Sequence, residues 1–205
     1  MTDHDDHGHA SHDHDHGHHH EHVLSYPDAV AAFRGDKDAF FASNPNSPIP
    51  AAERAAFSGL RYFPVNEGLY FEGLQLEPYT GDEPTTFQIP TSDGQLRPAR
   101  RAGVLRFDLD GEPRQLTGYQ FETGGDEGEL FVPFLDATSG GETYGAGRYL
   151  DLEPEDDGTY VLDFNLAYHP SCVYDPRFSC PLTPAENRLP VRIEAGERLA
   201  DDHAH

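Results

Sequence analysis

The sequence is poor in several residue types, and each shortage narrows what the protein can be. Among 205 residues there is no tryptophan, and methionine and lysine occur once each. No apolar run approaches the roughly 18 residues of a membrane-spanning helix, so we expect no membrane partner. The N-terminus also lacks a basic segment followed by an apolar one. This predicts no secretory signal and therefore a cytoplasmic location.

Basic residues are scarce as a class, with 14 Lys+Arg against 37 Asp+Glu. Residues 1–22 and 201–205 hold eight of the acids, so residues 23–200 still carry 29 acids and 14 bases. The one lysine is Lys37. An acid excess combined with lysine depletion predicts a halophilic protein, because dense carboxylates hold water and salt screens their repulsion; an ordinary acidic protein is the alternative. Nucleic acid is not an expected partner, since its backbone needs a basic surface.

Histidine is concentrated in a tail. Residues 1–22 contain ten of the 13 histidines and no apolar residue larger than alanine after Met1, which predicts a disordered His/Asp-rich segment. Imidazole beside carboxylate suits Zn, Ni or Cu, so this acidic, His-rich tail is a candidate for weak metal binding. The alternative is a solvated tail with no metal role. The densest candidate ligands are His18, His19, His20 and His22. Residues 201–205 are a second predicted disordered tail.

Residues 23–200 fit a single β-rich domain. A helix is expected over residues 26–42, and a second, shorter one after Pro50. From Leu69 onward the pattern changes to short alternating stretches separated by turn residues. About eight strands at hairpin spacing predict a mainly β fold, an antiparallel sandwich or barrel with one or two N-terminal helices.

Two stretches define this β pattern best. Val104–Asp110 alternates, Asp110–Gly111 reads as a tight hairpin turn, and Gln115–Phe121 is the expected return strand. Tyr160–His169 also alternates, with an apolar face and a face that carries Asp163, Asn165 and His169. Polar groups at this spacing rise from positions roughly 7 Å apart. They would line a pocket or face water.

Three blocks resemble the signature of a known family. They are GETYGAGRYLDLE at 141–153, LDFNLAYHPSCVYDPRFSCPLTPAENRLP at 162–190 and IEAGER at 193–198. The family is called domain of unknown function 1684, and the resemblance extends over roughly residues 24–198. It implies no activity and no catalytic residue. The chain departs at His169 and Ser171, where family-like sequences have Asn and Pro. Positions that match the pattern are Asp163, Asn165, Tyr168, Cys172, Cys180 and Asn187.

Cysteine is limited to Cys172 and Cys180, which enclose a short loop braced by prolines. A disulfide there would stabilise the fold by roughly 2.5 kcal/mol through loop entropy, although cytoplasmic redox conditions disfavour it. The alternatives are a buried thiol pair or two soft metal ligands, with His169 as a third. A cysteine nucleophile with His169 as its base is a further reading. The spacing is not CxxC, so neither a redox motif nor a zinc ribbon is indicated.

Arginines offer two further groups. The cluster of Arg97, Arg100, Arg101 and Arg106 would hold an anion or, in view of the acid excess, pair with carboxylates. Arg148 lies on a strand expected beside the Asp163 strand. If the register puts both on one face, Arg148 would hold Asp163 ionised.

These observations favour a binding protein for a small polar ligand or a metal ion, because no catalytic motif is present. The predicted pocket surrounds the Asp163/Asn165 strand and the Cys172–Cys180 loop. The alternative is a metal-dependent or thiol-dependent hydrolase that uses the same residues. The predicted ligand-binding residues are Arg148, Asp163, Asn165, Tyr168 and Asn187, and the predicted metal ligands are His169, Cys172 and Cys180.

Overall fold

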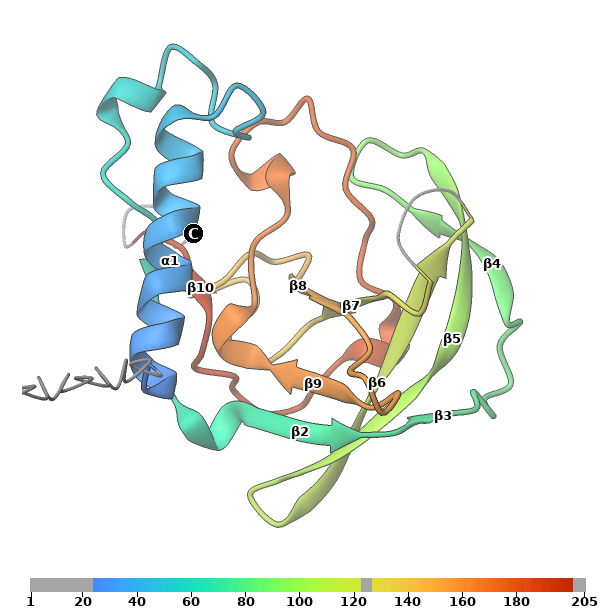
Figure 1. Ribbon diagram of the computed structural model, residues 1–205. Coiled ribbons are helices and arrows are strands. Elements are labelled where there is room, and N and C mark those ends of the chain that lie inside the picture. Colours follow the sequence, from blue (N-terminus) through green and yellow to red (C-terminus); the bar gives the residue numbers. More distant parts are fainter. Residues whose placement is uncertain (1–23, 123–126, 201–205) are drawn as a thin grey trace, which may run out of the picture.

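The computed structural model describes residues 24–122 and 127–200, so the predictions for the two tails lie outside it. Within these residues the chain has one α-helix and ten strands, and every strand pairing is antiparallel. The predicted mainly β, antiparallel fold is confirmed. Its sheets are arranged like a sandwich and form no closed barrel in the described part (Figure 1). No helix of this part is long and apolar enough to cross a membrane.

The helix α1 spans Tyr26–Ser43 and matches the predicted element. It begins where the Ser25 side chain accepts the N–H of Asp28, and it buries Val30 and Phe41. The second predicted helix is only a single 3₁₀ turn, η1 (Arg54–Ala56). None of its three residues is buried, so little apolar burial supports a longer helix here.

A long hairpin is the centre of the main sheet. β5 (Leu96–Leu109) and β6 (Glu112–Phe121) pair along nearly their whole length. The predicted turn at Asp110–Gly111 is confirmed, with φ of 55° and 78° at its two residues, as a primed hairpin turn requires. The sheet continues through β7 (Leu130–Phe134) and β8 (Arg148–Leu152) on one side, and through β3 (Leu76–Glu77) and β4 (Thr86–Pro90) on the other.

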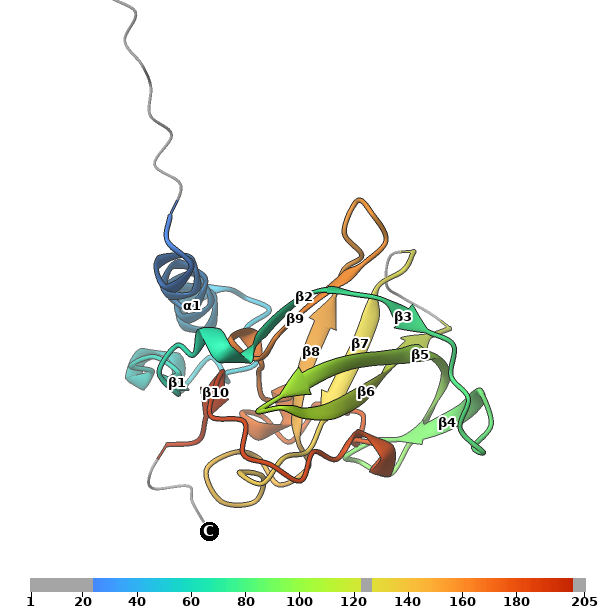
Figure 2. The same cartoon turned by 90° about the horizontal axis from the view of Figure 1, so that it is seen from below.

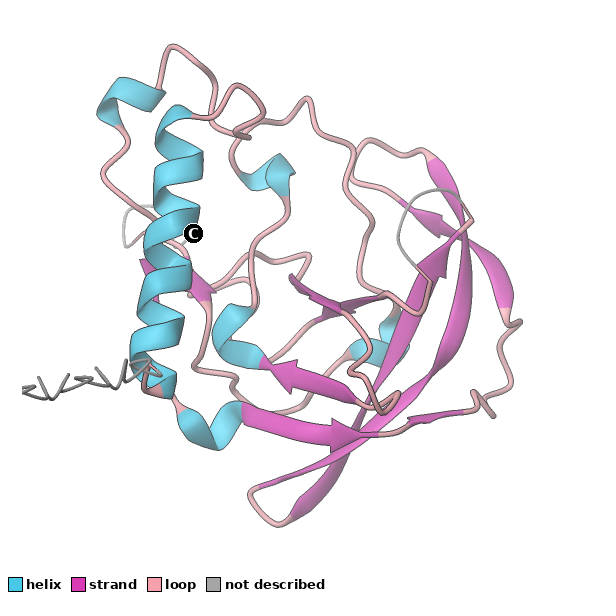
Figure 3. Cartoon of the chain, viewed as in Figure 1, coloured by secondary structure: helices cyan, strands magenta, loops and turns pink. Residues whose placement is uncertain are grey.

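Two shorter pairs complete the fold. β2 (Tyr70–Leu74) pairs with β9 (Tyr160–Asp163), and β1 (Arg61–Tyr62) pairs with β10 (Glu197–Arg198). Figure 2 shows β2 and β9 beside the strands of the main sheet. The core between them is apolar and includes Leu105, Leu116, Phe134, Leu162 and Phe164. Loops and short 3₁₀ turns join most of these elements (Figure 3).

The strand predicted from Tyr160 to His169 is shorter in the structure. β9 ends at Asp163, and the 3₁₀ turn η3 (Phe164–Leu166) follows. The cause is local: the Asp163 side chain accepts the N–H of Asn165, so the chain turns instead of staying extended. Asp163, Asn165 and His169 are therefore not on one strand face. Residues 188–194 form no strand, and Arg188 makes one isolated bridge to Leu135.

Candidate functional site

A cavity of about 550 Å³ lies beside β8 and β9. It is open to solvent, and its walls come from α1, β2, β8, β9 and η3, elements that are far apart in the sequence. The lining has three chemical classes. The acids are Glu129, Asp151, Glu153, Glu155 and Asp163; the aromatic residues are Phe33, Tyr70 and Tyr168; the aliphatic residues are Leu150, Leu152, Val161 and Leu166. The lining contains no lysine, arginine or histidine.

Asp151 and Tyr168 are directly linked in this cavity. The Tyr168 hydroxyl donates a hydrogen bond to Asp151 Oδ2. Asp151 reaches solvent through the opening, yet the surrounding protein desolvates its carboxylate and raises its pKa, which the Tyr168 hydrogen bond partly offsets. Burial beside Asp151 raises the pKa of Tyr168 as well, so its hydroxyl remains a donor. The Lys37 ammonium lies 4.6 Å from the centre of the Tyr168 ring but is paired with Glu197.

Asp163 belongs both to the cavity wall and to a buried hydrogen-bond network behind it. Its side chain, 5% exposed, accepts the Tyr26 hydroxyl at 2.8 Å and the N–H of Asn165 at 2.9 Å. Asn165 is fully buried; its amide donates to the Tyr26 hydroxyl and to the Asn66 carbonyl, and its Oδ1 accepts the Asn66 N–H. This network therefore links α1 and the segment before β2 to the end of β9. Asn165 does not line the cavity.

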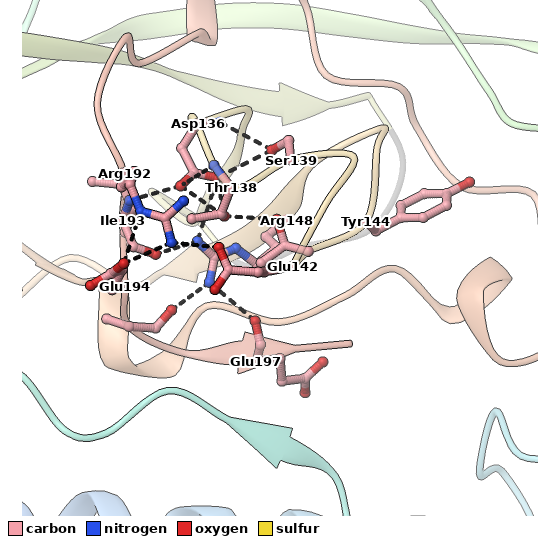
Figure 4. A network of polar contacts seen from close by, with 12 residues as sticks. Asp136, Thr138, Ser139, Glu142, Tyr144, Arg148, Arg192, Ile193, Glu194 and Glu197 are labelled. Atoms are coloured by element: carbon pink, nitrogen blue, oxygen red, sulfur yellow. Dashed lines mark hydrogen bonds and ion pairs between the residues drawn. The ribbon is translucent and has the colours of Figure 1, made fainter. Parts of the chain in front are cut away.

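Arg148 is separated from Asp163, and the pairing considered from the sequence does not form. β8 pairs with β7, whereas β9 pairs with β2. The Arg148 side chain is fully buried and lies 3.6 Å from Asp136 Oδ1. Figure 4 shows it among polar groups of the chain that leads into β10, where it donates to the carbonyls of residues 193 and 195 and to that of Glu197, the first residue of β10. Burial lowers its pKa to about 10, against the opposing charges of Asp136 and Glu197.

Asn187 is another predicted ligand-binding residue that the structure places away from the cavity. It is fully buried at the end of the 3₁₀ turn η5 (Ala185–Asn187). Its amide donates to the carbonyls of Thr117 and Pro133, and its Oδ1 accepts the N–H of Thr117, all at 2.8 Å. β6 and β7 pair through a single residue pair, so this side chain supplies the hydrogen bonds that the backbones do not make with each other.

His169 is buried and neutral. Its Nε2 accepts the N–H of Tyr144 at 3.4 Å, and its Nδ1 lies 3.6 Å from Glu197 Oε2. Burial, assisted by the cations of Arg148 and Lys37, lowers its pKa to about 3. Lys37 Nζ lies 2.5 Å from the other oxygen of Glu197.

Cys172 lies in the 3₁₀ turn η4 (Ser171–Val173), and Cys180 lies next to it in space. The Cys172 N–H donates to Cys180 Sγ at 3.3 Å, and burial raises the pKa of Cys180 to about 11. Neither residue lines the cavity. Within residues 24–122 and 127–200, no three His, Cys, Asp or Glu side chains converge in a way that could hold a metal ion.

The arginine cluster forms pairs within the protein. Arg101 contacts Glu186 and Arg106 contacts Glu77, each at 2.8 Å. Arg97 donates to the Ser179 carbonyl, and Arg100 donates to the Gln120 side chain. Two of the four arginines thus pair with carboxylates, as the acid excess predicts, and the other two donate to a carbonyl and to an amide oxygen.

Sequence reasoning identified two cavity residues, Asp163 and Tyr168, and missed the other acids. A usable signal was present in the stretch DLEPEDD at 151–157, where acids follow a buried strand at short intervals. The aromatic wall had no such signal, because Phe33 and Tyr70 belong to elements far from β9 in the chain.

Fold and cavity together describe a mainly β domain with an acid-lined, partly aromatic hollow. The family described as "Protein of unknown function (DUF1684)" matches residues 55–198, so the chain belongs to this family and the resemblance seen in the sequence is confirmed. A solved structure that it resembles is the solution NMR structure of an uncharacterized protein of Haloarcula marismortui. That protein is 40% identical, and the match has a TM-score of 0.64 and covers 87% of this chain and 95% of the other. A search of curated proteins found no match.

Proposed function

We propose that the protein binds a small, positively charged organic molecule in the cavity beside β8 and β9. The observation that carries this proposal is the lining itself: five carboxylates and three aromatic rings face one hollow that no basic residue lines. Carboxylates attract an ammonium group by charge, and aromatic faces attract it through the ring quadrupole. The cavity volume lies within the range of small-molecule sites.

Electrostatics supports a cationic ligand over a neutral or anionic one. Acids that share a hollow repel one another, and a bound cation relieves that repulsion. The raised pKa of Asp151 indicates that its ionised form is already disfavoured there. A metal ion is the weaker candidate, because the acids of the described chain do not converge into a set of three ligands.

The predicted residues divide into two roles under this proposal. Asp163 and Tyr168 contact the ligand, and Asn165 fixes Asp163 through the shared hydrogen bond. Arg148 and Asn187 hold the framework of the sheet. The alternative of a hydrolase that uses His169 or the cysteines receives no support from the geometry, since both His169 nitrogens face protein groups.

The test is a titration of the full chain, followed by amide NMR shifts, with 1,4-diaminobutane and tetramethylammonium as probes and succinate as the anionic control. We expect shifts at Leu150, Val161 and Leu166 with the cations and none there with succinate. Shifts that are absent, or strongest with succinate, contradict the proposal.

A pair of charge-matched variants sharpens this test. Glu153→Gln/Glu155→Gln removes two exposed acids from the cavity rim, whereas Glu83→Gln/Glu112→Gln removes two exposed acids elsewhere. At about 6 Å in a water-like dielectric each charge contributes about 0.7 kcal/mol, so the rim variant should bind roughly tenfold more weakly. Equal weakening in the control would mean that net charge, not the cavity, attracts the cation.

We propose a separate, weak metal-binding role for residues 1–22, supported by their ten histidines. Calorimetry with Zn or Ni should lose most of its weak sites when residues 1–22 are deleted, while the domain stays folded. Unchanged stoichiometry after deletion would refute the proposal.

We also propose that the acid excess is an adaptation to high salt and that nucleic acid is not a partner. A cytoplasmic location stays a prediction.

A further inference from the structure

We propose that Cys172 and Cys180 are a dithiol site that forms a reversible intramolecular disulfide. The backbone N–H of Cys172 donates to Cys180 Sγ at 3.3 Å, which places the sulfur of Cys180 directly against Cys172. This proximity of the two cysteines is the geometric condition that the sequence left open. This site is independent of the cation proposal, because neither cysteine lines the cavity.

The backbone holds the two cysteines in place before any bond forms. Residues 170–175 fold into a compact turn, in which the N–H groups of Val173 and Asp175 donate to the carbonyls of Pro170 and Ser171. At the other end, Cys180 exchanges two hydrogen bonds with Ser92, at 2.8 and 3.0 Å. Oxidation requires the sulfurs to close to about 2.05 Å, while these hydrogen bonds hold both ends of the loop.

The two thiols differ in access, which sets the order of the reaction. Cys172 is half-buried, whereas Cys180 is only 7% exposed. A disulfide reagent therefore meets Cys172 first, and Cys180 is the resolving thiol.

The exchange balances as follows. Cys172 loses its proton to water, and its thiolate attacks one sulfur of the reagent's disulfide, which breaks and releases one thiolate. Cys180 then loses its proton and attacks Cys172 Sγ in the mixed disulfide, releasing the second thiolate. Two protein thiols are oxidised, and one low-molecular-weight disulfide accepts two electrons and becomes two thiols.

Oxidation would stiffen a contact that joins distant elements. Between the cysteines lies Tyr174, whose ring packs 5.2 Å from Phe41 of α1 and whose hydroxyl donates to Glu197 of β10 at 2.9 Å. A disulfide here would close a small loop and so reduce the conformational entropy of the unfolded chain. The oxidised protein should melt about 5–10 °C higher than the reduced protein.

The experiment treats the reduced full chain with oxidised glutathione and measures the intact mass, followed by peptide mapping. We expect the loss of two hydrogens and one internal Cys172–Cys180 link, reversed by dithiothreitol. Cys180→Ser should instead accumulate the glutathione adduct at Cys172, because the resolving thiol is gone. Cys172→Ser should react at least about tenfold more slowly through its buried thiol.

Each other outcome overturns the proposal. A wild-type chain that keeps both thiols, that stops at a stable glutathione adduct, or that forms links only between two chains has no such site. The wild-type mass needs no substitution, so the test does not depend on the variants being folded. Melting of the oxidised and reduced wild-type protein provides the second readout, and equal melting temperatures would refute the stiffening of the loop.

Discussion

At the residue scale, the most informative side chain is that of Arg148, which stabilises the fold through buried polar contacts. Arg148 is the largest of the fully buried side chains in the described part of the protein. It pairs with Asp136 and donates to three main-chain carbonyls that lead into β10. A buried charge of this kind is tolerated only because its partners are in place, so removing it leaves the buried Asp136 carboxylate without its counter-charge and three carbonyls without this donor.

We therefore expect Arg148→Met to lower the free energy of unfolding by about 3–5 kcal/mol, as for other broken buried ion pairs. Urea unfolding followed by circular dichroism measures it. The matched control is Arg106→Met, which breaks the exposed pair with Glu77 and should change stability by less than about 1 kcal/mol. If both variants lose the same small amount, Arg148 does not support the chain before β10.

His169 is the second residue with a measurable signature. Its folded pKa of about 3 lies below the unfolded value of 6.5, so below pH 6.5 the unfolded chain takes up a proton that the folded chain does not. The stabilisation is fully present above pH 6.5 and is lost as the pH falls toward 3. At pH 5 the loss from this one residue is about 2 kcal/mol.

His169→Asn tests this directly. Asparagine keeps the backbone N–H that donates to Glu197 at 2.7 Å but does not titrate. The drop in unfolding free energy between pH 7.5 and pH 5 should be smaller in the variant by about 2 kcal/mol. Parallel pH profiles for the two proteins would show that His169 is protonated in the folded state.

At the element scale, α1 is attached to the sheets through few polar contacts, and one of them reaches the cavity. The Tyr26 hydroxyl, in the first turn of α1, donates to Asp163 and accepts from Asn165. Farther along, Arg34 donates to the carbonyls of Phe63 and Asn165. The helix thus fixes the cavity wall at β9 as well as contributing Phe33 to its lining.

Tyr26→Phe should loosen this attachment. The change removes one donor from a buried carboxylate, so the free energy of unfolding should fall by about 1–3 kcal/mol. Amide hydrogen exchange should accelerate in α1 before it does in β5 and β6. Tyr79→Phe, outside this network, serves as the control, and similar exchange in both variants would mean that apolar packing alone retains the helix.

At the scale of the whole molecule, the acid excess dominates. Residues 23–200 carry 29 acids and 14 bases, and few of the described acids pair with a base. At low ionic strength the remaining charges repel over distances comparable to the domain, whereas molar salt shortens the screening length to about 3 Å.

The melting temperature should therefore rise markedly from about 10 mM to molar KCl. Sucrose at matched osmolality is the control, because it is excluded from the protein surface but does not screen charge. Melting that does not change with KCl, or that rises equally in sucrose, would refute the adaptation to salt.

The sequence by itself determined the elements that local physics specifies. The hairpin of β5 and β6 follows from alternation and from the Asp110–Gly111 turn, and α1 follows from its cap and apolar positions. These signals act between residues a few positions apart, so they are visible without knowing the fold.

The tertiary structure alone decided what those elements bring together. Arg148 pairs with Asp136 because β8 lies beside β7, Tyr26 of α1 donates to Asp163 at the end of β9, and Phe33 lines the same cavity as Asp163. Each depends on which strands pair and on contacts between distant segments. A strand pattern fixes the face of a side chain relative to its own chain, but not the partner that this face meets.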